Sequence, residues 1–158
     1  MWRKCFSPTP SLVKVGGHRS ALNYVQQTLR SLGFDVTVQS TVKTVWLAGQ
    51  LKTTPVHNVL ARWPDTRPEV IWTSHYDSVP HSPGLSDAGQ GVAIVLAMAQ
   101  LTSFRPAWQK RFGFLLTDAE EVGLVGAQVF VNSGLVDKPF IVNLEARGAS
   151  GPSALFQM

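Results

Sequence analysis

Apolar and polar positions along the chain repeat with two different periods, and these periods predict its secondary structure. Leu22, Val25 and Leu29 recur at helical spacing and Gly33 follows as a stop, so an amphipathic helix is predicted over 18–32. Alternating positions, short apolar runs and Gly or Pro turns predict the other elements. The predicted strands are 34–38, 56–63, 70–74, 112–117 and 140–144, and the further helices are 91–101 and 122–131.

Strands and helices alternate through the second half of this pattern, which is typical of an α/β fold with parallel strands. Polar residues follow three of the predicted strands. His75 comes after the strand 70–74, Glu120 and Glu121 come after the strand 112–117, and Glu145 comes after the strand 140–144. Open α/β sheets bind ligands at the carboxyl ends of their strands, so we expect a functional site at this edge.

Composition narrows the classes of function. The chain has 158 residues, 44% hydrophobic and 15% charged, which is typical of one folded domain. Its longest apolar run, 92–99, is far shorter than a membrane span, which needs about 20 residues. No signal peptide is recognisable at the start. The net charge of +4 comes from scattered basic residues, which argues against a nucleic-acid partner. A lone cysteine, Cys5, excludes an internal disulfide and a multi-cysteine zinc site.

Each candidate residue has two possible interpretations when it is considered alone. His75 and Asp77 form either a metal-binding histidine with a supporting carboxylate or a turn with a capping aspartate. Asp87, in a Gly-rich segment, is either a helix cap or a carboxylate that bridges two cations. Glu120 and Glu121 lie between an apolar strand and an apolar helix, which favours one cation ligand and one proton carrier over two solvated acids.

The remaining acids and histidines have plainer interpretations. Glu145 is either a ligand or the ion-pair partner of Arg147. Asp118 is interpreted as a loop or capping acid, and His57 and His81 as structural residues. A serine-hydrolase elbow, a P-loop and a dinucleotide-binding glycine motif are all absent from the sequence.

Taken together, the order and spacing of these residues resembles peptidase family M-28. This family of co-catalytic zinc peptidases includes aminopeptidases and the metallopeptidases of endoplasmic reticulum and vacuolar membranes, and the membrane-associated branch is the most similar. The motifs that carry the resemblance are His75-x-Asp77, Ser86-Asp87, Glu120-Glu121-x-Gly123-Leu124-x-Gly126 and Asn143-Leu144-Glu145.

The resemblance implies a fold and a domain plan. We expect a three-layer α/β/α architecture whose central sheet is mixed and largely parallel, and which is incomplete on its C-terminal side. Residues 1–16 are expected to form an N-terminal extension, and residues 17–158 the N-terminal part of a zinc peptidase catalytic domain.

The resemblance also implies roles for single residues. His75 and Glu145 would bind one zinc ion, Glu121 would bind a second, and Asp87 would bridge the two. Glu120 would be the general base, and Asp77 would support His75 from behind. The expected reaction is hydrolysis of a terminal peptide bond, with an aminopeptidase favoured and a peptide with a free terminus as the substrate.

Two departures from the family pattern qualify these expectations. Ala88 stands where many relatives carry a second Asp or an Asn, and the family's cis bond would here join Asp87 to Ala88. The family's last zinc ligand, a histidine beyond the position of Glu145, has no match in this chain. We therefore expect at most one complete zinc site, and weak or no turnover from this chain alone.

Two other functions stay open. One is a glutaminyl cyclase that uses a single zinc ion on the same scaffold, and the other is a non-catalytic binding module with a related fold. Localisation is not predicted, although relatives are often membrane-associated or extracytoplasmic. The oligomeric state is also left open, because an incomplete sheet would expose a strand edge.

Overall fold

The structure is a computed structural model that describes residues 15–146 of the chain. Its helices are α1 (Val15–Ser31), α2 (Gln90–Ser103), α3 (Pro106–Gln109) and α4 (Val125–Val131), with a short π-helical turn at Leu85–Gly89. Its strands are β1 (Asp35–Leu47), β2 (Gln50–Arg62), β3 (Val70–His75), β4 (Phe112–Thr117) and β5 (Phe140–Asn143). Among the described residues, no helix combines the length and the apolar character needed to cross a membrane.

The five strands form one mixed sheet in the order β1-β2-β4-β3-β5. β1 pairs with β2, and β2 with β4, in antiparallel fashion, whereas β3 runs parallel to both β4 and β5. His75 lies opposite Thr117, and Thr73 lies opposite Asn143. The three parallel strands therefore end at the same edge of the sheet, as the sequence predicted.

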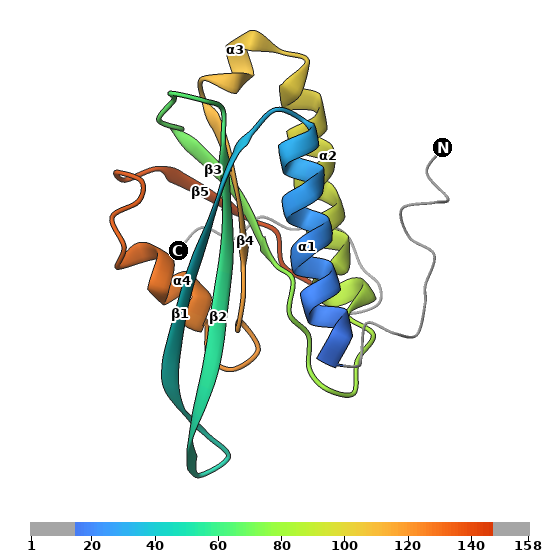
Figure 1. Cartoon of the computed structure of the whole chain (residues 1–158), viewed down its shortest axis with the longest axis vertical. Helices are drawn as coiled ribbons and strands as arrows, with labels where there is room; N and C mark the ends of the chain where they lie inside the picture. Colours follow the sequence, from blue (N-terminus) through green and yellow to red (C-terminus); the bar gives the residue numbers. More distant parts are fainter. Residues whose placement is uncertain (1–14, 147–158) are drawn as a thin grey trace.

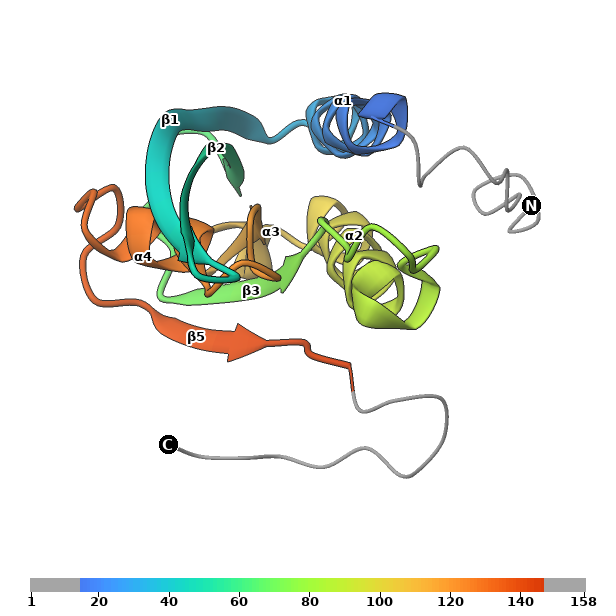
Figure 2. The same ribbon diagram turned by 90° about the horizontal axis from the view of Figure 1, so that it is seen from below.

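Helices cover both faces of this sheet, which confirms the expected three-layer architecture. On one face, α1 and α2 lie side by side and bury Leu29 and Val95 against Phe114 and Leu116 of β4 (Figures 1 and 2). On the other face, α4 packs Phe130 against a group of sheet side chains that includes Leu115. Neighbouring residues of β4 point to opposite faces because strand side chains alternate.

The first two strands differ from the prediction in length. The sequence predicted strands at 34–38 and 56–63, but β1 and β2 each run for 13 residues and form a long hairpin that projects beyond the rest of the fold (Figure 1). Its outer part is rich in Val and Thr, β-branched residues that are common in strands. Gly49, with φ +75°, closes the turn between the strands.

The helix predicted over 122–131 is wrong in its first turn. Gly123 and Leu124 adopt left-handed backbone with φ of 110° and 58°, so α4 begins only at Val125. The residues before it form a tight turn, in which the Gly123 and Leu124 N–H groups both donate to the Glu120 carbonyl. This turn places the adjacent glutamates at the carboxyl end of β4 instead of on a helix.

Candidate metal centre

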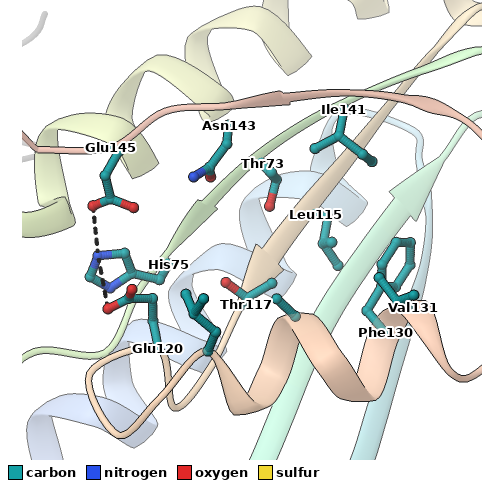
Figure 3. A pocket seen from close by; sticks show the side chains of 12 residues that line it. Thr73, His75, Leu115, Thr117, Glu120, Phe130, Val131, Ile141, Asn143 and Glu145 are labelled. Carbon is teal, nitrogen blue, oxygen red and sulfur yellow. Dashed lines mark ion pairs between the residues drawn. The ribbon is translucent and has the colours of Figure 1, made fainter. Parts of the chain in front are cut away.

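Five acidic side chains converge on His75 at the edge where the parallel strands end. The His75 Nε2 atom lies 2.9 Å from Asp87 Oδ1, 3.4 Å from Glu145 Oε1 and 3.9 Å from Glu120 Oε2. Ligand atoms of His75, Asp87 and Glu121 all lie within 4.8 Å of one another. Figure 3 shows Glu145 and Glu120 approaching the imidazole from two sides, each from the end of its own strand. The structure thus brings together all four residues predicted as metal ligands.

The orientation of the His75 ring is fixed from behind. The side chain is 1% exposed, and Nδ1 lies 3.1 Å from the backbone carbonyl oxygen of Asp77. An N–H group at Nδ1 donates to this carbonyl and leaves Nε2 directed at the acids. Metal-binding histidines commonly use one ring nitrogen in this way, which sets the tautomer of the other.

The Asp77 carboxylate holds the two glutamates in place through their backbone. Its Oδ1 accepts a hydrogen bond from the Glu120 N–H and its Oδ2 accepts one from the Glu121 N–H, both at 3.1 Å. One half-buried aspartate therefore ties the end of β3 to the turn after β4. Its expected supporting position next to His75 is observed, with Oδ1 at 3.5 Å from Nδ1.

Asp87 reaches the centre from the turn before α2. The Asp87–Ala88 peptide bond is cis, in agreement with the expectation from the family pattern, and Ala88 is buried. The start of α2 packs closely against β3 and the end of β5. A Cβ on Gly91 would overlap the Ser74 hydroxyl and the Leu144 carbonyl oxygen, so only glycine allows this approach. The Asp87 side chain itself stays 49% exposed and contacts His75.

The electrostatics of the cluster are dominated by negative charge. Burial lowers the pKa of His75, but hydrogen bonding to Asp77 and the charges of Asp77, Glu120 and Glu145 outweigh it and raise the pKa to about 10. Burial raises the pKa of Glu120 and of Glu121, and neighbouring acids raise both further. Within the part of the chain that the structure describes, every ion pair of this cluster involves His75 and none involves Lys or Arg.

These donors fit a divalent transition metal. Imidazole and carboxylate ligands at about 2.0–2.2 Å suit zinc, and tetrahedral ligands then lie about 3.3 Å apart. The separations of Nε2 from the Asp87 and Glu145 oxygens, 2.9 and 3.4 Å, bracket that value. Uncompensated acids around one buried imidazole also favour a cation electrostatically.

The structure gives Asp118 a larger part than the capping role predicted from sequence. Its side chain is 3% exposed, and it accepts hydrogen bonds from the His18 Nε2 atom at 2.8 Å and from the His57 N–H at 2.9 Å. Sequence reasoning missed His18 in this role, because 100 positions separate it from Asp118. The His57 ring contacts the Ser40 hydroxyl and His81 is exposed, so neither ring joins the cluster. Arg147, the alternative partner of Glu145, lies outside the described residues.

A pocket of about 270 Å³ opens beside the cluster, between α4 and β5. His75, Glu120 and Glu145 line one end, and Leu115, Phe130, Val131 and Ile141 line the other (Figure 3). The centre therefore lies at the mouth of a mainly apolar pocket, an arrangement common in sites for small ligands.

Curated proteins similar to this chain include peptidases from fungi and bacteria. A vacuolar membrane protease from Candida dubliniensis is 36% identical over 91 residues, which are 57% of this chain and 10% of that protein. A probable lipoprotein aminopeptidase from Mycobacterium tuberculosis is 34% identical over 115 residues, 72% of this chain and 23% of that protein. The chain thus spans a quarter or less of the length of these relatives.

Solved structures show the same fold. A Zn-dependent exopeptidase from Parabacteroides distasonis superposes with a TM-score of 0.74 at 19% identity, over 87% of this chain and 56% of that one. A glutaminyl cyclase from Porphyromonas gingivalis superposes with a TM-score of 0.73 at 23% identity, over 85% and 52% of the two chains. The profile of peptidase family M28 matches residues 58–158, which contain every residue of the cluster. The chain belongs to peptidase family M28.

Proposed function

We propose that this chain carries the zinc-binding and proton-transferring part of an exopeptidase site, and that the reaction is removal of an N-terminal residue. The observation that carries the proposal is the convergence of Asp87, Glu145 and Glu120 on His75 Nε2, with Nδ1 held by the Asp77 carbonyl. Family membership and relatives named as aminopeptidases support it.

In this proposal His75 and Glu145 would hold one zinc ion, Glu121 would be a ligand of a second, and Asp87 would serve both. A bound zinc ion would activate water and polarise the peptide carbonyl. The chain provides one imidazole for two ion positions, so we propose one well-held ion and a weaker second one.

Glu120 is the proposed general base. Its Oε2 atom lies 3.9 Å from His75 Nε2, farther away than the oxygens of Asp87 and Glu145. Its backbone N–H donates a hydrogen bond to Asp77. Burial and the neighbouring acids raise its pKa, which brings the carboxylate closer to the range in which it can both accept and return a proton. It would take a proton from the attacking water and pass it to the leaving amine.

The excess of carboxylates favours a substrate with a free N-terminus. A peptide ammonium group brings a positive charge to a region where Glu120, Glu121 and Asp87 lack any Lys or Arg partner among the described residues. The apolar pocket next to Glu120 would receive the side chain of the terminal residue, so we propose an apolar residue there.

The test starts from the chain stripped by a chelator and supplied with micromolar zinc. Metal analysis is expected to find zinc in the wild type and in Glu120→Gln, but none in His75→Ala. Hydrolysis by this chain alone is expected to be weak, but fluorogenic leucyl amide should be cleaved faster than its N-acetylated or aspartyl counterparts. Glu120→Gln should lose this activity while it keeps its zinc. Glu69→Gln, which changes an exposed acid outside the cluster, is the matched control.

Two outcomes would overturn the proposal. No zinc at micromolar supply would favour a binding module, and undiminished hydrolysis by Glu120→Gln would remove the assigned base. Glutaminyl cyclisation stays the second candidate, because a single imidazole suits a single-zinc site. A glutaminyl substrate separates the two reactions, since cyclisation releases ammonia and forms a pyroglutamyl product, whereas peptidase action releases free glutamine.

A further inference from the structure

A second cluster of titratable groups lies behind the metal centre. His18, in the first turn of α1, contacts the buried Asp118 carboxylate through Nε2 at 2.8 Å. Helix formation alone gives no reason for histidine here, since a positive side chain near a helix N-terminus opposes the helix dipole. The contact with Asp118 supplies a reason.

Asp118 leads directly into the turn that carries Glu120 and Glu121. Its Oδ1 also accepts a hydrogen bond from the Ala119 N–H at 2.7 Å, and Oδ2 accepts one from the His57 N–H at 2.9 Å. Its own N–H donates to Asn58 Oδ1 at 3.1 Å. The turn is therefore held at its start by Asp118 and two residues later by Asp77.

His18 also contacts the segment on the other side of the centre. Its ring stacks on Tyr76, with ring centroids 5.0 Å apart and planes at 26°. Tyr76 lies between His75 and Asp77, and its hydroxyl donates to the His57 carbonyl at 2.8 Å. One imidazole thus contacts two of the chain segments that supply the centre, although it lies on a different element.

We propose that His18 is a positioning residue that holds the turn of Glu120 and Glu121 in place through Asp118. The inference rests on the proposed function only in so far as this turn carries a zinc ligand and the base. His18 itself contacts neither substrate nor metal. Without its Nε2–H donor, the Asp118 carboxylate would lose its hydrogen bond to α1, and the turn would sample positions in which Glu121 no longer faces Asp87.

The charges of the pair agree with this geometry. Hydrogen bonding to Asp118 raises the pKa of His18 against the opposing effect of burial. Burial alone would raise the pKa of Asp118, but His18 and the His57 and Ala119 N–H groups lower it below its usual range. The ion pair is therefore favoured in the folded chain.

Three variants separate positioning from general stability. His18→Phe keeps a ring over Tyr76 but removes the donor to Asp118. His18→Gln restores an N–H donor at similar reach. Val25→Ala is the matched control, because it weakens the same helix at a core position that is 1% exposed and takes no part in the cluster.

The first readout is hydrogen exchange of the metal-free proteins, followed on peptides that cover 118–124. His18→Phe should exchange several-fold faster there, His18→Gln should exchange close to the wild-type rate, and Val25→Ala should show no acceleration confined to this peptide. The second readout is zinc affinity by competition with a chromophoric chelator, which should fall about 10-fold or more in His18→Phe and recover in His18→Gln.

Equal exchange in wild type and His18→Phe would overturn the proposal, and so would the same local acceleration in Val25→Ala. Unchanged zinc affinity in His18→Phe would likewise contradict it. Wild-type protein that binds no zinc would refute the proposed function, while the exchange experiment would still decide whether His18 holds the turn.

Discussion

The substitution Asp77→Asn tests whether the centre depends on a carboxylate that would itself touch no metal. Asp77 is 12% exposed, and its two oxygens accept the backbone N–H groups of Glu120 and Glu121, each at 3.1 Å. Asparagine has the same shape but keeps one acceptor. Its amide nitrogen would face one of the N–H groups as a second donor.

The expected cost follows from these two hydrogen bonds. A backbone donor left unpaired in a buried place costs about 1–3 kcal/mol, and the surviving bond changes from a charged to a weaker neutral acceptor. Removal of one negative charge from a crowded acidic cluster raises the free energy of unfolding by about 1 kcal/mol or less, because repulsion between the acids is reduced. The net loss is about 2 kcal/mol, which lowers the melting temperature of a chain of this size by about 4–8 °C.

The matched comparison is Asp87→Asn. This side chain is 49% exposed, and among the described residues its ion pair is with His75, at 2.9 Å, so the metal-free protein should lose less than about 1 kcal/mol. Zinc affinity should respond in the opposite order. Loss of the proposed bridging ligand Asp87 should weaken binding by more than about 100-fold, whereas Asp77→Asn should weaken it by about 10-fold.

Urea denaturation in chelator and zinc competition on the same preparations measure both quantities. The reasoning fails if Asp77→Asn leaves the stability of the metal-free protein unchanged. It fails equally if Asp87→Asn destabilises the protein as strongly as Asp77→Asn does, or if Asp87→Asn still binds zinc as tightly as wild type.

Three further perturbations have defined outcomes. Zinc at 100 times its Kd should stabilise the wild type by about 2.7 kcal/mol and raise its melting temperature by about 5–10 °C, and any similar rise in His75→Ala would contradict the site. The pKa of His18 is raised and that of Asp118 lowered, so their stabilisation is complete between about pH 4 and 6.5. It is lost as the pH rises through the raised His18 value or falls through the lowered Asp118 value. Urea unfolding of wild type and His18→Phe should therefore differ more at pH 5.5 than at pH 9, and an equal difference would contradict the pairing. Gly126→Ala should lower stability by about 1–2 kcal/mol on thermal unfolding, because the added Cβ would overlap the Asp118 backbone and Asn58. This cost outweighs a helix-propensity gain of about 1 kcal/mol. An unchanged or higher melting temperature would refute the overlap.

The positions of His75, Glu120, Glu121 and Glu145 could be predicted because each adjoins the end of an apolar strand. That information is local, since period and burial identify the strand and parallel pairing brings the strand ends together. Asp87 was harder to place, because its position depends on a turn whose backbone is not readable from residue periodicity. The family pattern, and not the periodicity, supplied that placement.

Features that depend on packing between distant segments could not be predicted from the sequence. His18 meets Asp118 only because α1 lies across the sheet, and nothing near either residue in the sequence indicates the other. The late start of α4 has a similar origin. Leu124 is a good helix former, but the two hydrogen bonds to the Glu120 carbonyl close a turn there instead.

The residues of the centre fall into two groups that differ in burial and in function. His75, Asp77 and Asp118 have side chains that are 1%, 12% and 3% exposed. Asp77 and Asp118 accept hydrogen bonds from backbone N–H groups of a neighbouring segment, and His75 bonds to the backbone carbonyl two residues further on. Asp87 and Glu145 are 49% and 44% exposed, and the charges that they face belong to the site itself. Stability should therefore depend mainly on the buried group, and metal binding on the exposed acids. A centre divided in this way can change its exposed ligands while the buried residues keep the strand ends in register.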